Sequence, residues 1–225
     1  MRAALSVIIP TLNAAEALPG CLAALIEGLE AGVIRELIVS DGGSGDATLK
    51  MADASGALIL QGAPSRGGQM RRGAQVAGGT WLLFLHADTV MPKGWSEAVR
   101  TQMEADGPAA FRLAFDVGGV MPSLVAGWAN LRSRVFGLPY GDQGLLVSRA
   151  EYEAVGGYKD IPLMEDVAMA RALRGRITLL PLAARTSAAR YRRDGWFRRG
   201  ARNLWTLARY VCGADPVSLA RQYRR

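Results

Sequence analysis

Acidic side chains at the ends of apolar runs are the residues of this chain best suited to chemistry. The run LFLHADTV (residues 83–90) contains the only histidine, His86, and Asp88 follows two residues later. Four further carboxylates complete the set: Asp41, Asp142, Glu165 and Asp166. Aspartates at the ligand-binding edge of a sheet, without histidine ligands, suit Mg²⁺ or Mn²⁺ shared with a diphosphate. We therefore expect a divalent metal ion of this kind.

Several common catalytic motifs are missing from the sequence. There is no Gly-x-x-x-x-Gly-Lys phosphate loop, and no Gly-x-Gly-x-x-Gly follows the first apolar run. A single histidine excludes His-rich metal sites, and no Gly-x-Ser-x-Gly motif accompanies it for a serine hydrolase. Cys21 and Cys212 match no metal or redox spacing, so a reducing compartment is the default expectation.

The positive charge is concentrated at one end of the chain. The formal net charge is +7, and residues 185–225 hold eleven arginines against two aspartates, whereas the rest is slightly acidic. Trp196, Phe197 and Trp205 alternate with these arginines at helical spacing, which predicts a basic amphipathic helix. Such a helix suits an anionic membrane surface or packs on its own domain, and nucleic acid is the least favoured partner.

The length of 225 residues fits one large domain with an appendage. We expect a catalytic domain over residues 1–185 and a basic amphipathic helical tail over residues 186–225. No 18 apolar residues follow one another, and the apolar stretch at the start is too short for a signal peptide. A cytoplasmic protein is expected, peripheral at the inner face of the membrane if the tail binds lipid.

Strand and helix signals alternate along the first 90 residues. Four apolar runs predict buried strands: residues 5–10, 36–41, 57–62 and 81–88. Asn13 and Glu16 form a possible capping box for a helix to about Ala31, and Asp46 is placed to cap a second helix. The alternation predicts a doubly wound α/β sheet, whose ligands bind beyond the carboxyl ends of its strands.

The second half of the chain is expected to complete the same sheet. Its patterns predict strands over residues 109–117, 143–149 and 176–184, and helices over residues 121–137, 149–158 and 164–175. No repeat, low-complexity segment or linker separates the two halves. Polar residues 11–13, 41–44 and 86–88 follow the first-half strands, so we expect them to converge at one edge of the sheet.

Four segments resemble the signatures of family 2 glycosyltransferases: SVIIPTLNAAE, IVSDGGSGDAT, LHADT and MEDVAMARAL. Two others, SRGGQMRRGA and YGDQGLLVSR, resemble a small bacterial subgroup that is partly labelled as arsenosugar-biosynthesis enzymes. The resemblance spans roughly residues 5–175. It implies the GT-A fold, a mixed but mainly parallel sheet with helices on both faces. It also implies an inverting, metal-dependent transfer of a sugar from a nucleotide diphosphate to an acceptor hydroxyl.

The resemblance also implies roles for individual residues. Thr11 and Asn13 would line the nucleotide pocket, and Asp41 would contact the base. The remaining assignments are Arg66 and Gln69 in a loop that covers the nucleotide, Asp88 as metal ligand, Asp166 beside Glu165 as catalytic base, and Asp142 with Gln143 in the acceptor region. His86 replaces the usual acid of an Asp-x-Asp motif, so hydrogen bonding to the donor is its expected role. Arg71 stands where relatives often carry asparagine.

Each motif alone also has an ordinary structural explanation. Asp41 could cap a strand end, Asp88 could belong to a turn, and acids at a helix start, such as Glu165, favour the helix dipole. Two rival functions remain open as well. A nucleotidyltransferase of similar fold should show a basic Gly-rich loop where this chain reads TLNAAE. A non-catalytic module would bind an anionic surface or nucleic acid through the tail.

Overall fold

Four parallel strands form the first half of the sheet in the computed structural model, which describes residues 3–173 and 176–223. They are β1 (Leu5–Thr11), β2 (Ile34–Asp41), β3 (Leu58–Gln61) and β4 (Trp81–Phe84). Every residue of β1 is buried, and β1 pairs with β2 on one side and β4 on the other. A fully covered parallel strand explains the unbroken apolar runs of the sequence.

The second half of the chain continues the same sheet with mixed strand directions. It adds β5 (Thr89–Val90), β6 (Ala109–Phe115), β7 (Leu145–Ser148) and β8 (Thr178–Thr186), in the overall order β3-β2-β1-β4-β7-β6-β8-β5. β7 runs antiparallel to β4 and β6, whereas β6 and β8 are parallel. The predicted mixed, mainly parallel α/β sheet is confirmed.

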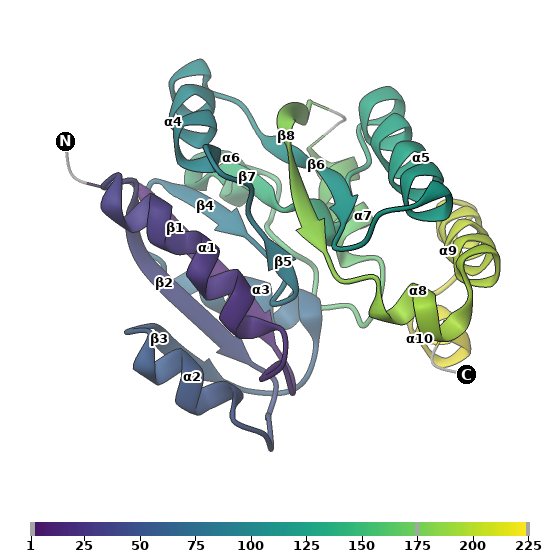
Figure 1. The fold of residues 1–225 in the computed structure, drawn as a ribbon, viewed down its shortest axis with the longest axis horizontal. Coiled ribbons are helices and arrows are strands. Elements are labelled where there is room, and N and C mark those ends of the chain that lie inside the picture. Colours follow the sequence, from purple (N-terminus) through teal and green to yellow (C-terminus); the bar gives the residue numbers. More distant parts are fainter. Residues whose placement is uncertain (1–2, 174–175, 224–225) are drawn as a thin grey trace.

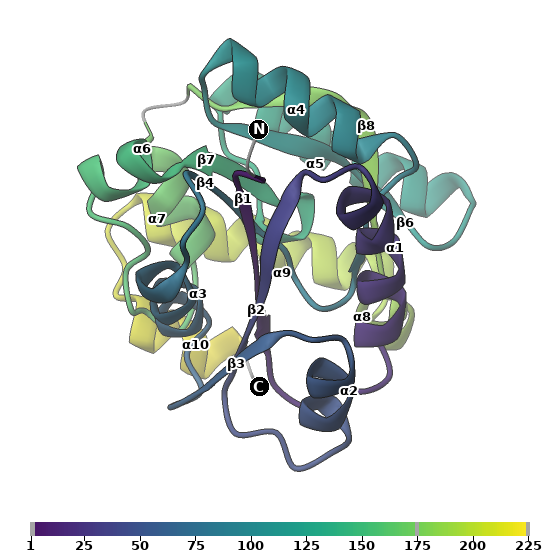
Figure 2. The same cartoon turned by 90° about the vertical axis from the view of Figure 1, so that its left-hand side faces the viewer.

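Helices cover both faces of the sheet (Figures 1 and 2). α1 (Leu18–Glu30), α2 (Thr48–Ala54) and α4 (Trp95–Ala105) lie on one side, and α3 (Arg66–Val76), α6 (Arg149–Ala154) and α7 (Glu165–Ala172) lie on the other. Val7 and Ile9 of β1 join one apolar core and Ile8 joins the other. The alternation of side chains along β1 therefore supports both layers.

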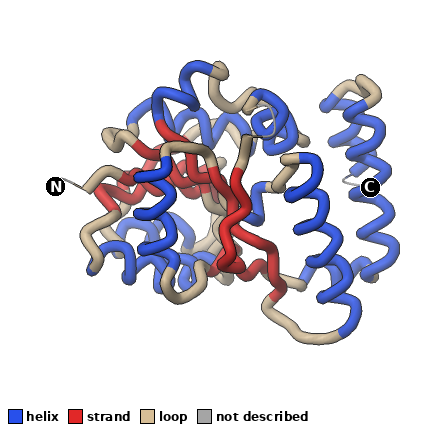
Figure 3. The backbone as a smooth tube through the Cα atoms, turned by 90° about the horizontal axis from the view of Figure 1, so that it is seen from above, coloured by secondary structure: helices blue, strands red, loops and turns tan. Residues whose placement is uncertain are grey.

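The remaining helices stand at the far end of the molecule from the N-terminus (Figures 1 and 3). α5 (Val120–Phe136) follows β6, and α8 (Ala189–Asp194), α9 (Trp196–Val211) and α10 (Pro216–Tyr223) follow β8. Trp196 packs edge-on against Phe115 of β6 at 5.1 Å between ring centroids, and α9 also contacts α5. None of the helices described is long and apolar enough to cross a bilayer.

Two local expectations are wrong. The helix expected from Asn13 begins at Leu18, because the Asn13 side chain is used elsewhere: its Oδ1 accepts the Gly45 amide at 2.9 Å, and its φ is +49°. The strand expected to reach Asp88 ends at Phe84, and Thr89–Val90 then pairs antiparallel with β8. His86 and Asp88 therefore lie in a turn between two strands. At the start of α2, Asp46 accepts the Thr48 amide at 3.0 Å, but the N-cap residue is Ala47, so Asp46 stands one position before the cap and not at it.

Candidate active site

The carboxyl ends of β1 and β2 are tied together by Asp41. The hydroxyls of Thr11 and Ser44 donate to its Oδ1 at 2.8 and 2.5 Å, and the amides of Gly43 and Ser44 donate to its Oδ2 at 2.8 and 2.7 Å. Burial raises the pKa of Asp41, but these hydrogen bonds outweigh it and the pKa is lowered. Asp41 is thus an ionised anchor that fixes the turn after β2.

Gln69 braces the same edge from α3. Its buried amide donates to the carbonyls of Thr11 at 2.7 Å and Ser40 at 2.8 Å, so it joins the ends of both strands. Arg66 and Gln69 both belong to α3, which begins at Arg66, and not to the loop that was expected. The capping hydroxyl of Ser65, which accepts the Gly68 amide, marks this helix start.

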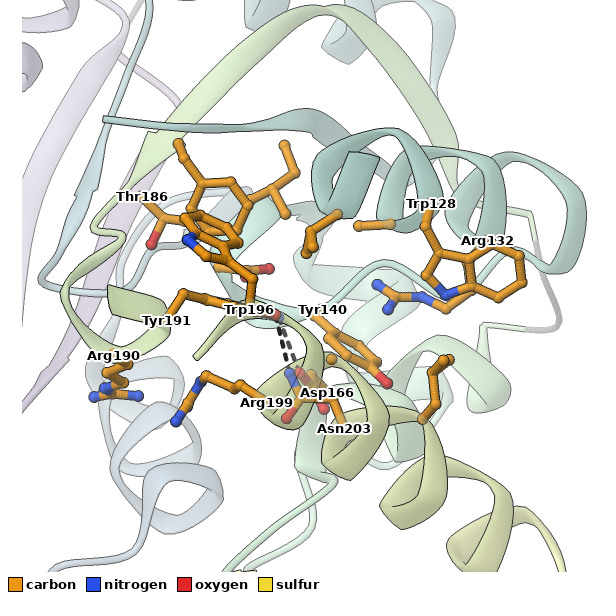
Figure 4. Close-up of a pocket in the computed structure, with 18 of the residues that line it drawn as sticks. Trp128, Arg132, Tyr140, Asp166, Thr186, Arg190, Tyr191, Trp196, Arg199 and Asn203 are labelled. Atoms are coloured by element: carbon orange, nitrogen blue, oxygen red, sulfur yellow. Dashed lines mark hydrogen bonds between the residues drawn. The ribbon is translucent and has the colours of Figure 1, made fainter. Parts of the chain in front are cut away.

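A pocket of about 490 Å³ opens beyond the carboxyl end of β4, between the sheet and the helices α5, α8 and α9, and Arg66 of α3 reaches it. Six of the predicted site residues line it: Arg66, His86, Asp88, Asp142, Glu165 and Asp166. Figure 4 shows Trp128 and Arg132 of α5 on one side, Tyr191 and Trp196 on the other, and Asp166 between them. The pocket therefore combines a carboxylate floor with aromatic walls.

Glu165 and Asp166 open α7 but have different surroundings. Glu165 is buried and forms an ion pair with Arg66, whose Nη1 lies 3.3 Å from Oε1. Burial raises the pKa of Glu165, and the neighbouring charge of Asp166 raises it further against the opposing effect of Arg66. Asp166 faces the pocket, and its Oδ2 accepts the Gly141 amide at 3.0 Å. Asp166 is thus the member of the pair that is open to a ligand.

The backbone just before this pair is strained. Met164 precedes the first residue of α7 and has a φ of +66°, a left-handed conformation that a residue with a side chain rarely adopts. Such conformations cost about 1–3 kcal/mol and persist where the surrounding structure enforces them. The strain at Met164 sets the direction from which Glu165 and Asp166 enter the pocket.

Asp142 lies in the 3₁₀ turn Gly141–Gln143 between α5 and β7. Burial raises its pKa to about 6, Arg132 opposes this shift, and the charges of Asp166 and Asp88 add to it. Among the described residues no group hydrogen-bonds its Oδ1. A buried carboxylate oxygen without a partner is costly, so this atom points to a ligand that is absent here.

Gln143, the neighbour of Asp142, does not line the pocket. It is fully buried, its Oε1 accepts from the Ser133 hydroxyl at 2.8 Å, and its amide donates to the Phe111 carbonyl at 3.0 Å. The guanidinium of Arg132 lies 3.4 Å from the ring centroid of Tyr140 and donates to the Leu138 carbonyl at 2.9 Å. These contacts hold the turn rigid, so Gln143 positions Asp142.

His86 and Asp88 enter the pocket from the turn after β4. Burial lowers the pKa of His86 well below its usual value, and Arg66 and Arg190 lower it further, so the ring is neutral at pH 7. Within the described part of the chain its buried Nε2 has no hydrogen-bond partner. The ring also lies against Gly141, where an added Cβ would approach Nε2 to 2.3 Å. His86 is therefore placed to hydrogen-bond a ligand as a neutral group.

A metal ion would need ligands from outside the protein. Among residues 3–173 and 176–223, no three His, Cys, Asp or Glu side chains lie close enough together to hold one. Asp88 faces the pocket as a single carboxylate, which suits Mg²⁺ because this ion is often held by one or two carboxylates and substrate phosphates. The donor set thus fits an ion shared with a diphosphate and does not fit an all-protein metal site.

The predicted residues fall into two groups. Thr11, Asn13, Asp41 and Gln69 form a hydrogen-bonded cluster at the ends of β1 and β2, and the six pocket residues lie next to it. Sequence reasoning missed the wall made by Trp128, Arg132, Tyr140 and Tyr191. The apolar positions of residues 121–137 could have indicated part of this wall, because large apolar side chains on one face of a helix predict a contact surface.

The sheet order and the edge at which the pocket lies define the class of the protein as a GT-A fold. Two solved structures support this. TarS of Staphylococcus aureus (residues 1–349) matches with a TM-score of 0.65 and 16% identity over 96% of this chain and 68% of that chain. Glucosyl-3-phosphoglycerate synthase of Mycobacterium tuberculosis matches with a TM-score of 0.56 and 20% identity over 82% of this chain and 70% of the other. At these identities the likeness shows the fold alone.

The family follows from the sequence. A model of glycosyl transferase family 2 matches residues 6–126, and the chain belongs to this family. A relative from Mycobacterium tuberculosis, named PGL/p-HBAD biosynthesis glycosyltransferase, is 42% identical over 90 residues, which are 37% of this chain and 34% of that protein. A protein of the same name from Mycobacterium bovis matches equally. The match thus spans about a third of the length of these relatives.

Proposed function

We propose that the chain transfers a sugar from a nucleotide diphosphate donor to an acceptor hydroxyl, with inversion at the anomeric carbon and with Mg²⁺ or Mn²⁺. The observation that carries the proposal is one pocket, lined by Asp88, Asp142 and Asp166, that opens just beyond the carboxyl end of β4, the neighbour of β1. Ligands of doubly wound sheets bind at this edge. The subgroup resemblance of residues 65–74 and 140–149 stays a prediction.

The donor would lie across the ends of β1 and β2. Thr11, Asn13, Asp41 and Gln69 shape this edge, and Arg66 brings a positive charge to the pocket side of it. TarS has been crystallised with UDP and with UDP-GlcNAc, and the mycobacterial synthase with UDP and Mn²⁺. These complexes support a uridine nucleotide as donor. The neutral ring of His86 would hydrogen-bond the donor through Nε2.

Asp88 is the residue that would hold the metal ion. When bound, a divalent ion neutralises the charge that develops on the leaving diphosphate. Arg66 adds a second positive charge, and its ion pair with Glu165 keeps the guanidinium at the pocket. The mycobacterial synthase, which shares the fold, has been crystallised with Mn²⁺ and with Mg²⁺, and this supports a divalent ion here.

Asp166 would be the catalytic base. As the acceptor oxygen bonds to the anomeric carbon, the bond from that carbon to the diphosphate oxygen breaks and the acceptor proton passes to Asp166. The Gly141 amide donates to Oδ2 of Asp166 at 3.0 Å and the Val167 amide to its Oδ1 at 2.7 Å, and these two hydrogen bonds fix the orientation of the carboxylate. Glu165 is engaged by Arg66 and buried, so its role is to position the arginine. Asp142 lies near the same pocket and would contact the acceptor.

The two rival functions have less support. A nucleotidyltransferase would need a basic Gly-rich loop after β1, where the structure has Thr11 and Asn13 bound to the turn after β2. A binding module that used only the arginine-rich end would leave the carboxylate cluster without a purpose. The match of residues 6–126 to a glycosyltransferase family also favours transfer chemistry.

Calorimetric titration with UDP or GDP, with and without Mg²⁺, tests the donor site. We expect tight binding only with the ion, and Asp88→Asn should abolish the metal-dependent part of the affinity. Asp53→Asn, an exposed aspartate on α2, is the matched control and should bind like the wild type. Unchanged metal dependence in Asp88→Asn would remove Asp88 from the site. If neither UDP nor GDP binds, the proposal of a nucleotide diphosphate donor is wrong.

A further inference from the structure

α9 exposes most of its large apolar side chains, and the residues that it buries, Arg199 and Thr206, are polar. Phe197 is 79% exposed and Trp205 66%, and Leu204 and Val211 are exposed on the same helix. Arg199, by contrast, is only 7% exposed, because its guanidinium donates to Asp194 at 2.7 Å and to the Tyr223 hydroxyl at 3.1 Å. A surface helix of a soluble protein normally turns its apolar stripe inward. The orientation of α9 is the reverse.

α5 shows the same reversal. Five of its large apolar residues recur at spacings of three and four and are exposed: Val120, Leu124, Trp128, Leu131 and Val135. Met121 and Val125 are half-buried. Its buried residues are small or polar, such as Ala126, Ala129 and Ser133. The small residues let α5 pack closely on β6, and Asn130 fastens it there by two hydrogen bonds to Leu113. The large apolar side chains are left facing outward.

The two helices contact each other and together form one surface, which we call the apolar face. It comprises the outward residues of both helices: Val120, Leu124, Trp128, Leu131, Val135, Phe136, Phe197, Leu204, Trp205 and Val211. Four of these residues also line the pocket: Leu124, Trp128, Phe197 and Leu204. The apolar face therefore borders the pocket that holds Asp166. An exposed apolar patch of this kind marks an interaction site.

The charge around the apolar face selects its partner. Neither α5 nor α9 contains an aspartate or a glutamate. Arg134 and Arg198 are exposed, and Arg198 and Arg209 stand seven residues before and four residues after Trp205, on its side of α9. Aromatic residues beside arginines on one helix suit the interface of an anionic bilayer. A second copy would bring the same arginines against each other, which argues against a dimer.

We propose that the apolar face docks the protein on a bilayer that contains anionic lipids. Phe197, Trp205 and the α5 residues enter the headgroup region, and the flanking arginines contact lipid phosphates. The pocket then opens toward the bilayer, so its acceptor is a hydroxyl-bearing molecule anchored in the membrane. Docking itself is independent of the proposed transfer, whereas the nature of the acceptor rests on it.

Flotation of the full chain with vesicles tests the docking. Vesicles of phosphatidylcholine alone are compared with equimolar phosphatidylcholine and phosphatidylglycerol, at low and high salt. The wild type should bind the anionic vesicles, and binding should weaken in salt because exposed charges are screened. Equal binding to both vesicle types, or no binding to either, would overturn the proposal.

Two pairs of substitutions locate the contact. Val135→Gln with Trp205→Gln removes one residue from each helix and leaves the pocket lining intact; it should weaken vesicle affinity at least about ten-fold. Ile26→Gln with Leu29→Gln is the matched control, since these α1 residues are 51% and 56% exposed on another part of the molecule. An equal loss in both pairs would overturn the assignment to the apolar face.

The charged residues and the competing partner are tested separately. Arg134→Gln with Arg198→Gln should lower affinity for anionic vesicles roughly five-fold per arginine without altering the response to neutral ones. Sedimentation in lipid-free buffer should show a monomer. A dimer that Val135→Gln with Trp205→Gln dissociates would show that a second copy covers the face. Intact UDP binding without vesicle binding would overturn docking and leave the proposed function standing.

Discussion

Three aspartates of the pocket differ in what holds them. Asp142 has a buried oxygen that no described group hydrogen-bonds, Asp166 accepts the Gly141 and Val167 amides, and Asp88 stands in a turn between strands. Burial raises the pKa of the Asp142 carboxyl, so this acid keeps its proton to a higher pH than an aspartate in water does. The three carboxylates stand in different surroundings, which suits the separate roles proposed for them.

Asp166→Asn should leave donor affinity unchanged and lower the rate of donor cleavage about 10²–10⁴-fold, the usual contribution of a general base. Water serves as the acceptor in this assay, and release of the nucleoside diphosphate is measured. Glu165→Gln should instead weaken donor binding, because it removes the ion pair that holds Arg66. The reverse result, with Asp166→Asn nearly active and Glu165→Gln inactive, would exchange the two roles.

Asp142 gives the metal-free protein a specific pH dependence. Burial raises its pKa from 3.8 to about 6. Between these two pH values the folded state therefore binds more protons than the unfolded chain, and the free energy of unfolding falls as pH rises through this range. Asp142→Asn removes the cost of ionising this buried carboxyl. Relative to wild type, its free energy of unfolding should improve by up to about 3 kcal/mol between about pH 4 and pH 7.

Urea titrations at several pH values measure this difference. The exposed substitution Asp53→Asn is the control and should show a constant offset from wild type across the range. A constant offset for Asp142→Asn as well would mean that the Asp142 carboxyl ionises as freely in the folded protein as in the unfolded chain.

Among the helices and strands, α3 is the one whose first turn positions Arg66 in the pocket. Gly67 packs so closely that an added Cβ would lie 2.0 Å from the Lys159 carbonyl oxygen, and Ser65 hydrogen-bonds Asp160. The start of α3 is thereby fixed against the segment that leads to Glu165. Arg66 consequently reaches Glu165 from a rigid base.

Gly67→Ala should therefore destabilise the protein by about 1–3 kcal/mol, because backbone atoms cannot yield as a side chain can. Gly127→Ala in α5 is the matched control: its Cβ meets nothing within 4 Å, and alanine favours a helix over glycine by about 1 kcal/mol. Free energies of unfolding from urea titration decide between them. Equal stability of the two variants would show that α3 can move away from the Lys159 carbonyl without a loss of folding free energy.

Helices and strands were predictable from the sequence where an apolar pattern extends over many residues. They were not predictable where their position depends on contacts between residues far apart in the sequence. β1, β2 and α5 follow directly from their apolar patterns. The start of α1 did not, because Asn13 binds the backbone of Gly45 and not its own helix. β5 has two residues and pairs with β8, where Thr89 lies opposite Thr186 and Val90 opposite Arg185, partners far away in the sequence, so no local signal marks it.

The candidate site was predictable in its carboxylates and not in its walls. Asp88 and Asp166 stand in motifs that the sequence shows, whereas Arg132 and Tyr140 meet only when α5 packs beside the 3₁₀ turn. The arginine-rich end of the sequence predicted an amphipathic helix. α9 is such a helix, with apolar side chains such as Phe197 on one side and Arg199 on another. Which face of α9 points outward depends on Asp194 and Tyr223, which no helical wheel contains.

At the scale of the whole molecule, the strand ends and the C-terminal helices enclose one pocket from opposite sides. The parallel half brings the residues proposed for the donor, and α5, α8 and α9 bring the surface proposed for the acceptor (Figure 1). Asp166 lies between these two sides (Figure 4). In the proposed reaction, the acceptor would attack the anomeric carbon from the side opposite the leaving diphosphate.

Proton NMR of donor cleavage tests the proposed inversion and the role of Asp166 together. The protein is incubated with Mg²⁺ and a UDP-sugar whose anomeric bond is α, and the anomer released to water is followed before it equilibrates. We expect the β-anomer first, at a rate that Asp166→Asn lowers at least about 100-fold. Initial release of the α-anomer, or cleavage at an equal rate in Asp166→Asn, would contradict the proposal.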